Sequence, residues 1–137
     1  NHSMTETVHF LQIWIVPDRR GVAPRYQQVH FPQDSKRGRL RLIISPDGQD
    51  GSLGVYQDVR VYAGLFDGAD CDALELGQKR HAYVHVARGQ ASINGVALGE
   101  GDGARLRGEP QVRVENGVNA ELLLFNLRPH ELPRADY

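Results

Sequence analysis

Short apolar runs broken by turn residues recur along the whole chain, and they set the expected fold class. Alternation of apolar and polar positions, as in Val55 to Phe66, has the two-residue period of a strand with one buried face. Sustained helical spacing is absent, and 15 glycines and 7 prolines are spread through the sequence. Ten strands are predicted: Val8–Val16, Arg25–Phe31, Arg39–Ile44, Val55–Phe66, His81–Val86, Ala91–Ile93, Val96–Leu98, Ala104–Leu106, Val112–Val114 and Glu121–Leu127.

Some of these segments carry more detailed expectations. The run Val8–Val16 is apolar on both faces and stops at Pro17, which is typical of a strand buried on both sides. Asn94-Gly95 predicts a two-residue hairpin, because such a turn needs positive φ at both positions, and Asn116-Gly117 predicts a second turn. In Gly101-Asp102 the aspartate is expected to bond nearby backbone amides. Close turns between short strands indicate an all-β sandwich or barrel.

Length and charge narrow the classes of function. The 137 residues are expected to form one domain, 1–137, with its own core. A formal net charge of −1 gives no electrostatic reason to bind nucleic acid or an anionic membrane. The basic run Lys36–Arg41 is interpreted as a solvated turn and strand start, since it is too short to line a groove. The tail Arg128–Tyr137 is expected to lie on the surface.

The single cysteine, Cys71, excludes an internal disulfide and a cysteine-rich zinc site. Its neighbours Asp70 and Asp72 disfavour a thiolate, so a reactive nucleophile is not expected. The cytoplasm is therefore the expected compartment. No apolar run reaches the length that spans a bilayer, and no membrane association is expected.

A set of short motifs in a fixed order carries a family resemblance. The motifs are Leu11-Gln12-Ile13-Trp14-Ile15-Val16-Pro17, Pro24-Arg25-Tyr26, Ile44-Ser45-Pro46-Asp47-Gly48, Gly51-Ser52-Leu53 and Gln57-Asp58. Together they resemble the pirin family, and more narrowly the bacterial pirin-like proteins assigned quercetin 2,3-dioxygenase activity. The stretch Tyr83–Asp102, a strand, a hairpin and a Gly-Asp turn, also resembles the cupin pattern.

The resemblance implies a cupin-type double-stranded β-helix, a jelly-roll barrel or sandwich. Members of the family are bicupins, and the resemblance covers only their C-terminal half. It implies that the N-terminal cupin of such a protein holds a metal, usually iron, on three histidines and a glutamate. The chain opens at Asn1-His2-Ser3, just past where that cupin would close, so we expect a C-terminal part without the metal-binding cupin.

A metal site belonging to this half is not expected, because the cupin ligand positions carry other residues. Counting back from Gly89, the glutamate position falls on Ala82. The His-x-His positions fall within Glu75–Gln78, and the late histidine falls within Gly108–Arg113; neither range contains a histidine. The sequence therefore predicts no metal, cofactor-binding or catalytic residue in this chain, and a metal, iron or another divalent ion, only in the parent protein.

Other chemistry-bearing residues have plainer interpretations. His81 and His85 would lie about 13 Å apart on one outer face of a strand, too far to share an ion. Trp14 could be a ligand platform, but core or inter-domain packing is favoured by its apolar run. Four further histidines are scattered, two serines lack a nucleophile elbow, and two carboxylates lack acid–base spacing. These residues are His2, His9, His30 and His130, Ser45 and Ser52, and Asp58 and Glu75.

We therefore expect a structural role, in which the domain packs against the metal-bearing N-terminal cupin and catalyses nothing alone. Two alternatives stay open. One is a barrel that binds a small molecule, for which Gln12 and Gln57 are the candidate inward polar residues. The other is a protein-interaction domain of a pirin-like transcriptional cofactor. The isolated chain is also expected to form a homodimer through exposed apolar surface.

Overall fold

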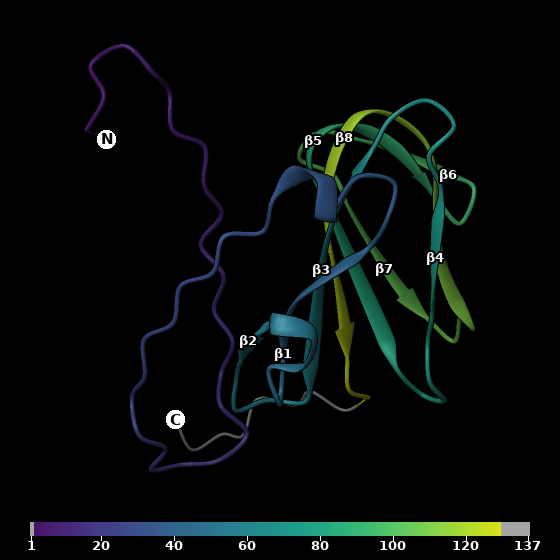
Figure 1. The fold of residues 1–137 in the computed structure, drawn as a ribbon. Helices are drawn as coiled ribbons and strands as arrows, with labels where there is room; N and C mark the ends of the chain where they lie inside the picture. Colours follow the sequence, from purple (N-terminus) through teal and green to yellow (C-terminus); the bar gives the residue numbers. More distant parts are fainter. Residues whose placement is uncertain (1, 130–137) are drawn as a thin grey trace.

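The computed structural model describes residues 2–129. Within this range the chain forms eight strands and two short 3-10 helices, preceded by an extended arm, residues 2–31, without regular secondary structure (Figure 1). The elements are η1 (Gln33–Ser35), β1 (Arg41–Ser45), η2 (Gln49–Gly51), β2 (Leu53–Gly54), β3 (Val59–Phe66), β4 (Asp72–Glu75), β5 (His81–Ile93), β6 (Val96–Gly99), β7 (Gly103–Arg107) and β8 (Gln111–Leu127). Among the described residues, no helix has the length and apolar character needed to cross a membrane.

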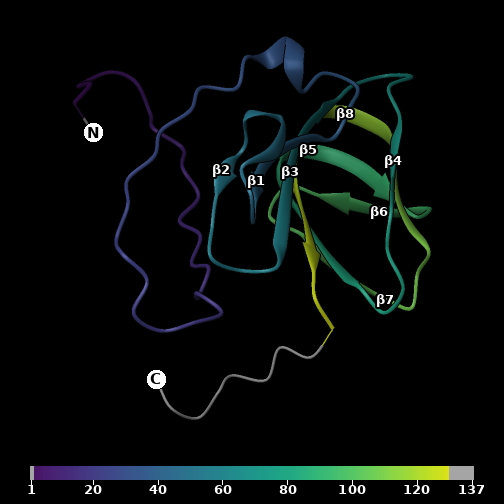
Figure 2. The ribbon, with the colours of Figure 1, turned by 60° about the horizontal axis from the view of Figure 1, so that its bottom comes forward.

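Strands β5 and β8 form the centre of the sheet and pair from His81 opposite Leu127 to Ile93 opposite Val114. The first half of β5 also pairs with β7, and its second half pairs with β6. In the same way β4 pairs with the start of β8, and β3 pairs with the end of β8. On its other side β3 pairs with β1, which in turn pairs with β2. Because both long strands curve midway, one hydrogen-bonded network folds into two facing layers (Figure 2). The predicted all-β sandwich is confirmed.

The curvature of the β5–β8 pair coincides with three register shifts. Gly89 has a φ of +66°, and a Cβ atom there would lie 2.3 Å from the carbonyl oxygens of both Val118 and Asn119. On the opposite strand, Asn116 and Asn119 have φ values of 54° and 46°. Only glycine permits the backbone approach at position 89, so the bend depends on that residue.

The second predicted turn, Asn116-Gly117, is wrong, because both residues lie inside β8. The positive φ of Asn116 makes a bulge in a continuous ladder instead of a chain reversal. The predicted strands Val112–Val114 and Glu121–Leu127 are consequently two parts of β8. The same holds for β5, which joins two predicted strands, and β4 is an additional short strand that the pattern did not predict.

Two of the predicted turns are confirmed. Asn94 and Gly95 have φ values of 48° and 82° and connect β5 to β6. Asp102 accepts a hydrogen bond from the Gly99 amide through Oδ2 at 2.9 Å. Both turns are set by residues close in sequence, which is why local pattern predicts them.

The core lies between the two layers and is apolar. Alternate residues of the paired strands point inward, as the two-residue period predicts. Its buried members are Phe66, Leu76, Ala82, Val84, Ala91, Ile93, Leu106, Val112, Val114, Ala120, Leu122 and Leu124. Tyr62 packs against this cluster, and its burial raises the pKa of the phenol.

The prediction of a buried strand at Val8–Val16 is wrong for this structure, and so is the strand at Arg25–Phe31. Both segments belong to the extended arm, in which Phe10 is 75% and Trp14 is 84% exposed. A core position for Trp14 is therefore excluded. The residues have strand-like character, but no strand of the described domain pairs with them, and few of their backbone groups are hydrogen-bonded to the domain. Arg128 and Pro129 are half-buried, and the rest of the predicted tail lies outside the described residues.

The bend at Gly89 generates a stability prediction. Gly89→Ala is expected to lower the free energy of unfolding by more than about 3 kcal/mol, because Cβ would overlap two backbone oxygens that cannot move independently. Gly95→Ala is the matched control, since Gly95 also has positive φ but no atom within 4 Å of the added Cβ. Its expected cost is about 1–2 kcal/mol. Urea unfolding measures both, and equal losses would contradict the account of the bend.

Candidate functional site

Each of the three regions in which the cupin pattern places metal ligands contributes one aliphatic residue to the core. Leu76, Ala82 and Val112 belong to one packed cluster and are 9%, 0% and 0% exposed. Aliphatic side chains have no lone pair to donate, so the metal that the fold implies does not fit these residues. Within residues 2–129 there is also no group of three or more His, Cys, Asp or Glu that could hold a metal ion.

His81 and His85 lie on the outer face of β5, as predicted. The alternate residues Ala82, Val84 and Val86 are fully buried on the inner face. The residues paired with the two histidines on β7 and β8 are arginine, glycine and leucine. None of these provides a further ligand, so the histidine pair does not form the start of a metal site.

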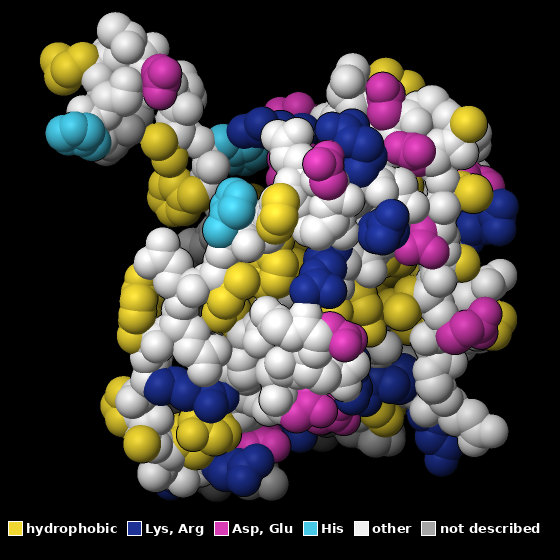
Figure 3. Space-filling model, in the orientation of Figure 1, with side chains coloured by type: hydrophobic (Ala, Val, Ile, Leu, Met, Phe, Trp, Pro, Cys, Tyr) yellow, Lys and Arg dark blue, Asp and Glu magenta, His cyan; other side chains and the backbone are white. Residues whose placement is uncertain are grey.

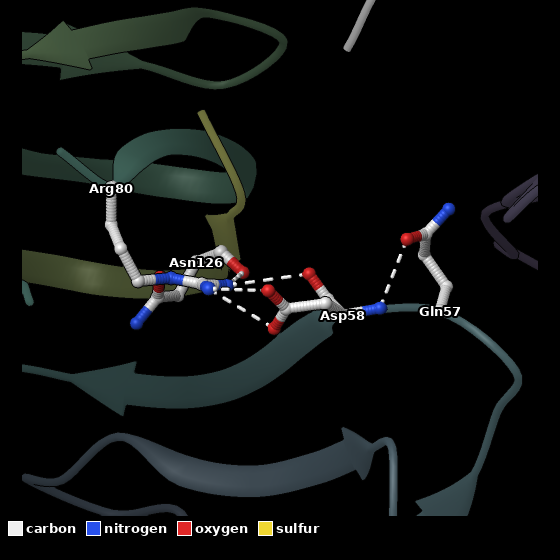
Figure 4. Close-up of polar contacts among 4 residues, drawn as sticks. All are labelled: Gln57, Asp58, Arg80 and Asn126. Atoms are coloured by element: carbon white, nitrogen blue, oxygen red, sulfur yellow. Dashed lines mark hydrogen bonds and ion pairs between the residues drawn. The ribbon is translucent and has the colours of Figure 1, made fainter. Parts of the chain in front are cut away.

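A polar cluster around Arg80 joins Asp58 and Asn126 (Figure 4). Arg80 Nη1 donates to both carboxylate oxygens of Asp58, at 3.0 and 2.8 Å. Its Nε donates to Asn126 Oδ1, and Nη2 donates to the backbone oxygens of Asp58 and Asn126. The guanidinium thus joins the start of β3, the end of β8 and the loop before β5. Asp58 is engaged here, and it makes no carboxylate pair with Glu75.

Ser45, in the Ser45-Pro46-Asp47-Gly48 turn, and the nearby Ser52 have structural roles. Ser45 is fully buried, donates to Asp47 Oδ1 at 2.9 Å and lies 2.8 Å from Ser52 Oγ. The hydrogen bond from Ser45 lowers the pKa of the Asp47 carboxyl. No histidine bonds to either serine in the described part of the chain, so the turn has no activated nucleophile.

The arm is held against the domain by a few polar anchors at intervals. They are Arg88 Nε to His9 Nδ1 (3.2 Å), Gln57 Nε2 to Val16 O (2.8 Å), the Asp18 amide to Tyr56 O (2.7 Å) and the Gly54 amide to Gln27 Oε1 (2.9 Å). Arg25 also lies over the Tyr56 ring, 4.3 Å from its centroid. Gln57 therefore binds the arm, and Gln12 is exposed on it, so neither supplies a polar group to the interior.

A groove of about 420 Å³ separates the arm from the outer face of β3, β8 and β5. Its lining combines apolar residues, among them Phe10, Leu11, Ile13, Leu65 and Leu123, with the charged residues Lys36, Arg88 and Glu121. Apolar side chains run along the arm and over the adjoining surface (Figure 3). Phe10 and Trp14 of the arm are 75% and 84% exposed, and clustered exposed apolar side chains are common at interaction sites. The arm and this outer face are named the arm surface below.

Comparison with known proteins assigns the family. The model described as the quercetinase C-terminal cupin domain of pirins matches residues 42–127. The chain belongs to this family. A quercetin 2,3-dioxygenase of Escherichia coli K12 is 36% identical over 129 residues, which are 94% of this chain and 54% of that protein. A pirin-like protein of Caulobacter vibrioides is 31% identical over 122 residues, 88% of this chain and 53% of that protein.

Solved structures agree with the pirin assignment and with the predicted cupin-type fold. YhhW from Escherichia coli superposes with a TM-score of 0.79 at 31% identity, over 87% of this chain and 50% of that one. A structure of the same bacterial pirin with nickel(II) gives 0.78 at 32%, over 85% and 49%. The chain thus spans about half the length of the relatives it matches.

The arm lies outside the family model but mostly inside the match to the longer relatives. The C-terminal cupin model begins at residue 42, whereas the match to the Escherichia coli relative takes in 94% of the chain. Most of the arm is therefore shared with the longer proteins although it lies outside their C-terminal cupin model. The pirin motifs Leu11–Pro17 and Pro24–Tyr26 fall in this part of the sequence.

The contacts of Arg80 predict that the stability of the domain depends on the shape of the guanidinium group as well as on its charge. Arg80→Lys keeps the charge but loses the forked contacts to Asp58 and Asn126, and it is expected to lower the free energy of unfolding by about 1.5–3 kcal/mol. Arg113→Lys is the control, because the Arg113–Glu115 pair is exposed and its loss should leave the free energy of unfolding nearly unchanged. Thermal or urea unfolding separates the two, and an Arg80→Lys variant as stable as the control would contradict the role.

The exposure of the arm predicts that its aromatic residues do not stabilise the isolated domain. Trp14→Ser and Phe10→Ser are each expected to change the free energy of unfolding by less than about 0.5 kcal/mol. Leu124→Ala, at a fully buried position, is expected to cost about 2–5 kcal/mol. Urea unfolding of the three variants tests this, and a large loss in Trp14→Ser would show that the ring packs against its own domain.

Proposed function

We propose that this chain is the metal-free cupin half of a pirin-like protein resembling quercetin 2,3-dioxygenase, and that its role is structural. It packs against a metal-bearing cupin and catalyses nothing alone. The observation that carries the proposal is the aliphatic filling of the ligand region by Leu76, Ala82 and Val112. The half-length match to longer pirin-like proteins supports the existence of a second, different half.

Iron or another divalent metal, held by that other half, would supply the Lewis acid and oxygen chemistry of the parent protein. The contribution of this chain is to support and orient the neighbouring cupin. Its interior is packed, Arg80 ties β3 to β8, and the groove on its outer sheet face mixes apolar with charged side chains. A rigid domain of this kind can hold a neighbouring cupin in one orientation and keep water from the contact.

A protein-interaction role is the second candidate, and the arm surface favours it. Trp14 and Tyr26 are each 84% exposed, and aromatic side chains are enriched where proteins bind one another. A small-molecule barrel has less support, because the interior is filled and neither Gln12 nor Gln57 reaches it. The single exposed thiol of Cys71 is compatible with a cytoplasmic location, which we include in the proposal.

Metal content tests the proposed role directly. The chain, purified without a histidine tag and incubated separately with iron, nickel, manganese and zinc, is expected to retain less than about 0.1 equivalent of each by mass spectrometry. The Escherichia coli quercetin 2,3-dioxygenase relative, treated in parallel, is the positive control. Close to one equivalent of any metal on this chain would overturn the proposal, because scattered histidines would then have to converge on a site.

A further inference from the structure

We propose that the groove between the arm and the sheet binds a small apolar monocarboxylate, whose carboxylate contacts Lys36 and whose body packs against Leu65 and Leu123. This inference goes beyond the proposed structural role, since it needs only residues of this chain. The class of ligand follows from the charge balance of the groove, from an ammonium group without a partner and from the apolar walls.

A row of residues across the sheet sets the charges of the groove. The Leu65 amide donates to Lys36 O at 2.9 Å, and Leu65 lies opposite Glu121 in the β3–β8 ladder. Glu121 in turn lies opposite Arg88 in the β8–β5 ladder. All four residues line the groove, and neighbouring strands are about 5 Å apart, so these long side chains reach a common space.

Lys36 is the charge that remains when the other groups of the groove are paired. Arg88 Nε lies 3.8 Å from Glu121 Oε2, so these two charges offset each other. Arg88 Nε also donates to His9 Nδ1 at 3.2 Å, and an imidazole nitrogen that accepts a hydrogen bond carries no proton. The charged and titratable groups that line the groove are these four, and together they leave one positive charge. A ligand with one negative charge would balance it.

The ammonium group of Lys36 has unused donors. Lys36 is half-buried, and within residues 2–129 its side chain makes no hydrogen bond or ion pair. Its backbone is fixed, because its amide donates to Gln33 O and its carbonyl accepts from Leu65 and Arg39. A carboxylate at this position would form charge-assisted hydrogen bonds without displacing a protein partner.

The walls of the groove select the rest of the ligand. Leu65 and Leu123 lie on the sheet side, and Leu11 and Ile13, which are 41% and 40% exposed, lie on the arm side. The volume of about 420 Å³ is that of a small-molecule pocket. An inorganic anion would leave these walls in water, and an uncharged hydrocarbon would leave Lys36 without a partner. An apolar carboxylate uses both features.

Titration of the isotope-labelled chain with 2-naphthoate, followed by the NMR shifts of backbone amides, tests the proposal. Shifts at Lys36, Leu65 and Leu123 are expected to saturate with a Kd below about 2 mM. The uncharged analogue 2-naphthamide, which has nearly the same shape, is expected to bind at least about tenfold more weakly. Inorganic phosphate is expected to give no saturable shift.

A lysine pair tests the role of the charge. Lys36→Met keeps an apolar stem and is expected to weaken 2-naphthoate binding at least about fivefold. Lys79→Met is the matched control, because Lys79 is the other lysine of the chain, is exposed and does not line the groove. It is expected to leave the affinity unchanged. Lys36→Arg is expected to keep the affinity within about threefold.

An alanine pair tests whether the ligand lies in the groove. Ala63 lines it and points away from the core, since the neighbouring Tyr62 packs against the core. Ala63→Leu fills part of the volume and is expected to weaken binding at least about fivefold with Lys36 intact. Ala73→Leu, at an exposed position of β4, is the control and is expected to have no effect.

Four results would overturn the inference. They are no saturable binding of 2-naphthoate, equal affinity for 2-naphthamide, unchanged affinity in a folded Lys36→Met variant, and shifts confined to the exposed Phe10 and Trp14. Amides of β5 and β8 report folding, and if Lys36→Met does not fold, the comparison with 2-naphthamide on the unaltered chain decides. Metal content is measured separately, so failure here leaves the proposed function standing.

Discussion

The close approach of Gly89 to the carbonyl oxygens of Val118 and Asn119 is the contact on which the rest of the structure depends. It lets β5 and β8, the two longest strands, bend together while their ladder continues. Each end of the pair can then take different neighbours: β7 and β3 at one end, β6 and β4 at the other. The two layers, the enclosed core and the position of the cupin ligand region all follow from that bend.

The centre of the sandwich is packed with apolar side chains. The same inward positions that could carry metal ligands carry leucine, alanine and valine, and they contribute packing in place of coordination. On the outside of the sandwich, the arm is anchored at a few points by Gln57, Tyr56 and Arg88, and it lies over a groove beside the sheet.

The parts that could be predicted from sequence are those set by near neighbours or by residue identity. The Asn94-Gly95 hairpin and the inward alternation of Ala82, Val84 and Val86 are of this kind. The bulge at Asn116 could not be predicted, because the same residue type also makes turns and only the partner strand decides. The Arg80 cluster joins residues 22 and 46 positions away, a contact that only the tertiary fold reveals.

The segment Val8–Val16 shows a different limit of prediction from sequence. Its pattern predicts a buried strand, but no strand of the described domain pairs with it.

The central claim, that the metal belongs to the other half, is tested most directly by a crystal structure of the two-cupin protein with anomalous data at the metal edge. The account predicts one anomalous peak, outside the domain formed by β1 to β8. A peak among Leu76, Ala82 and Val112 would contradict it.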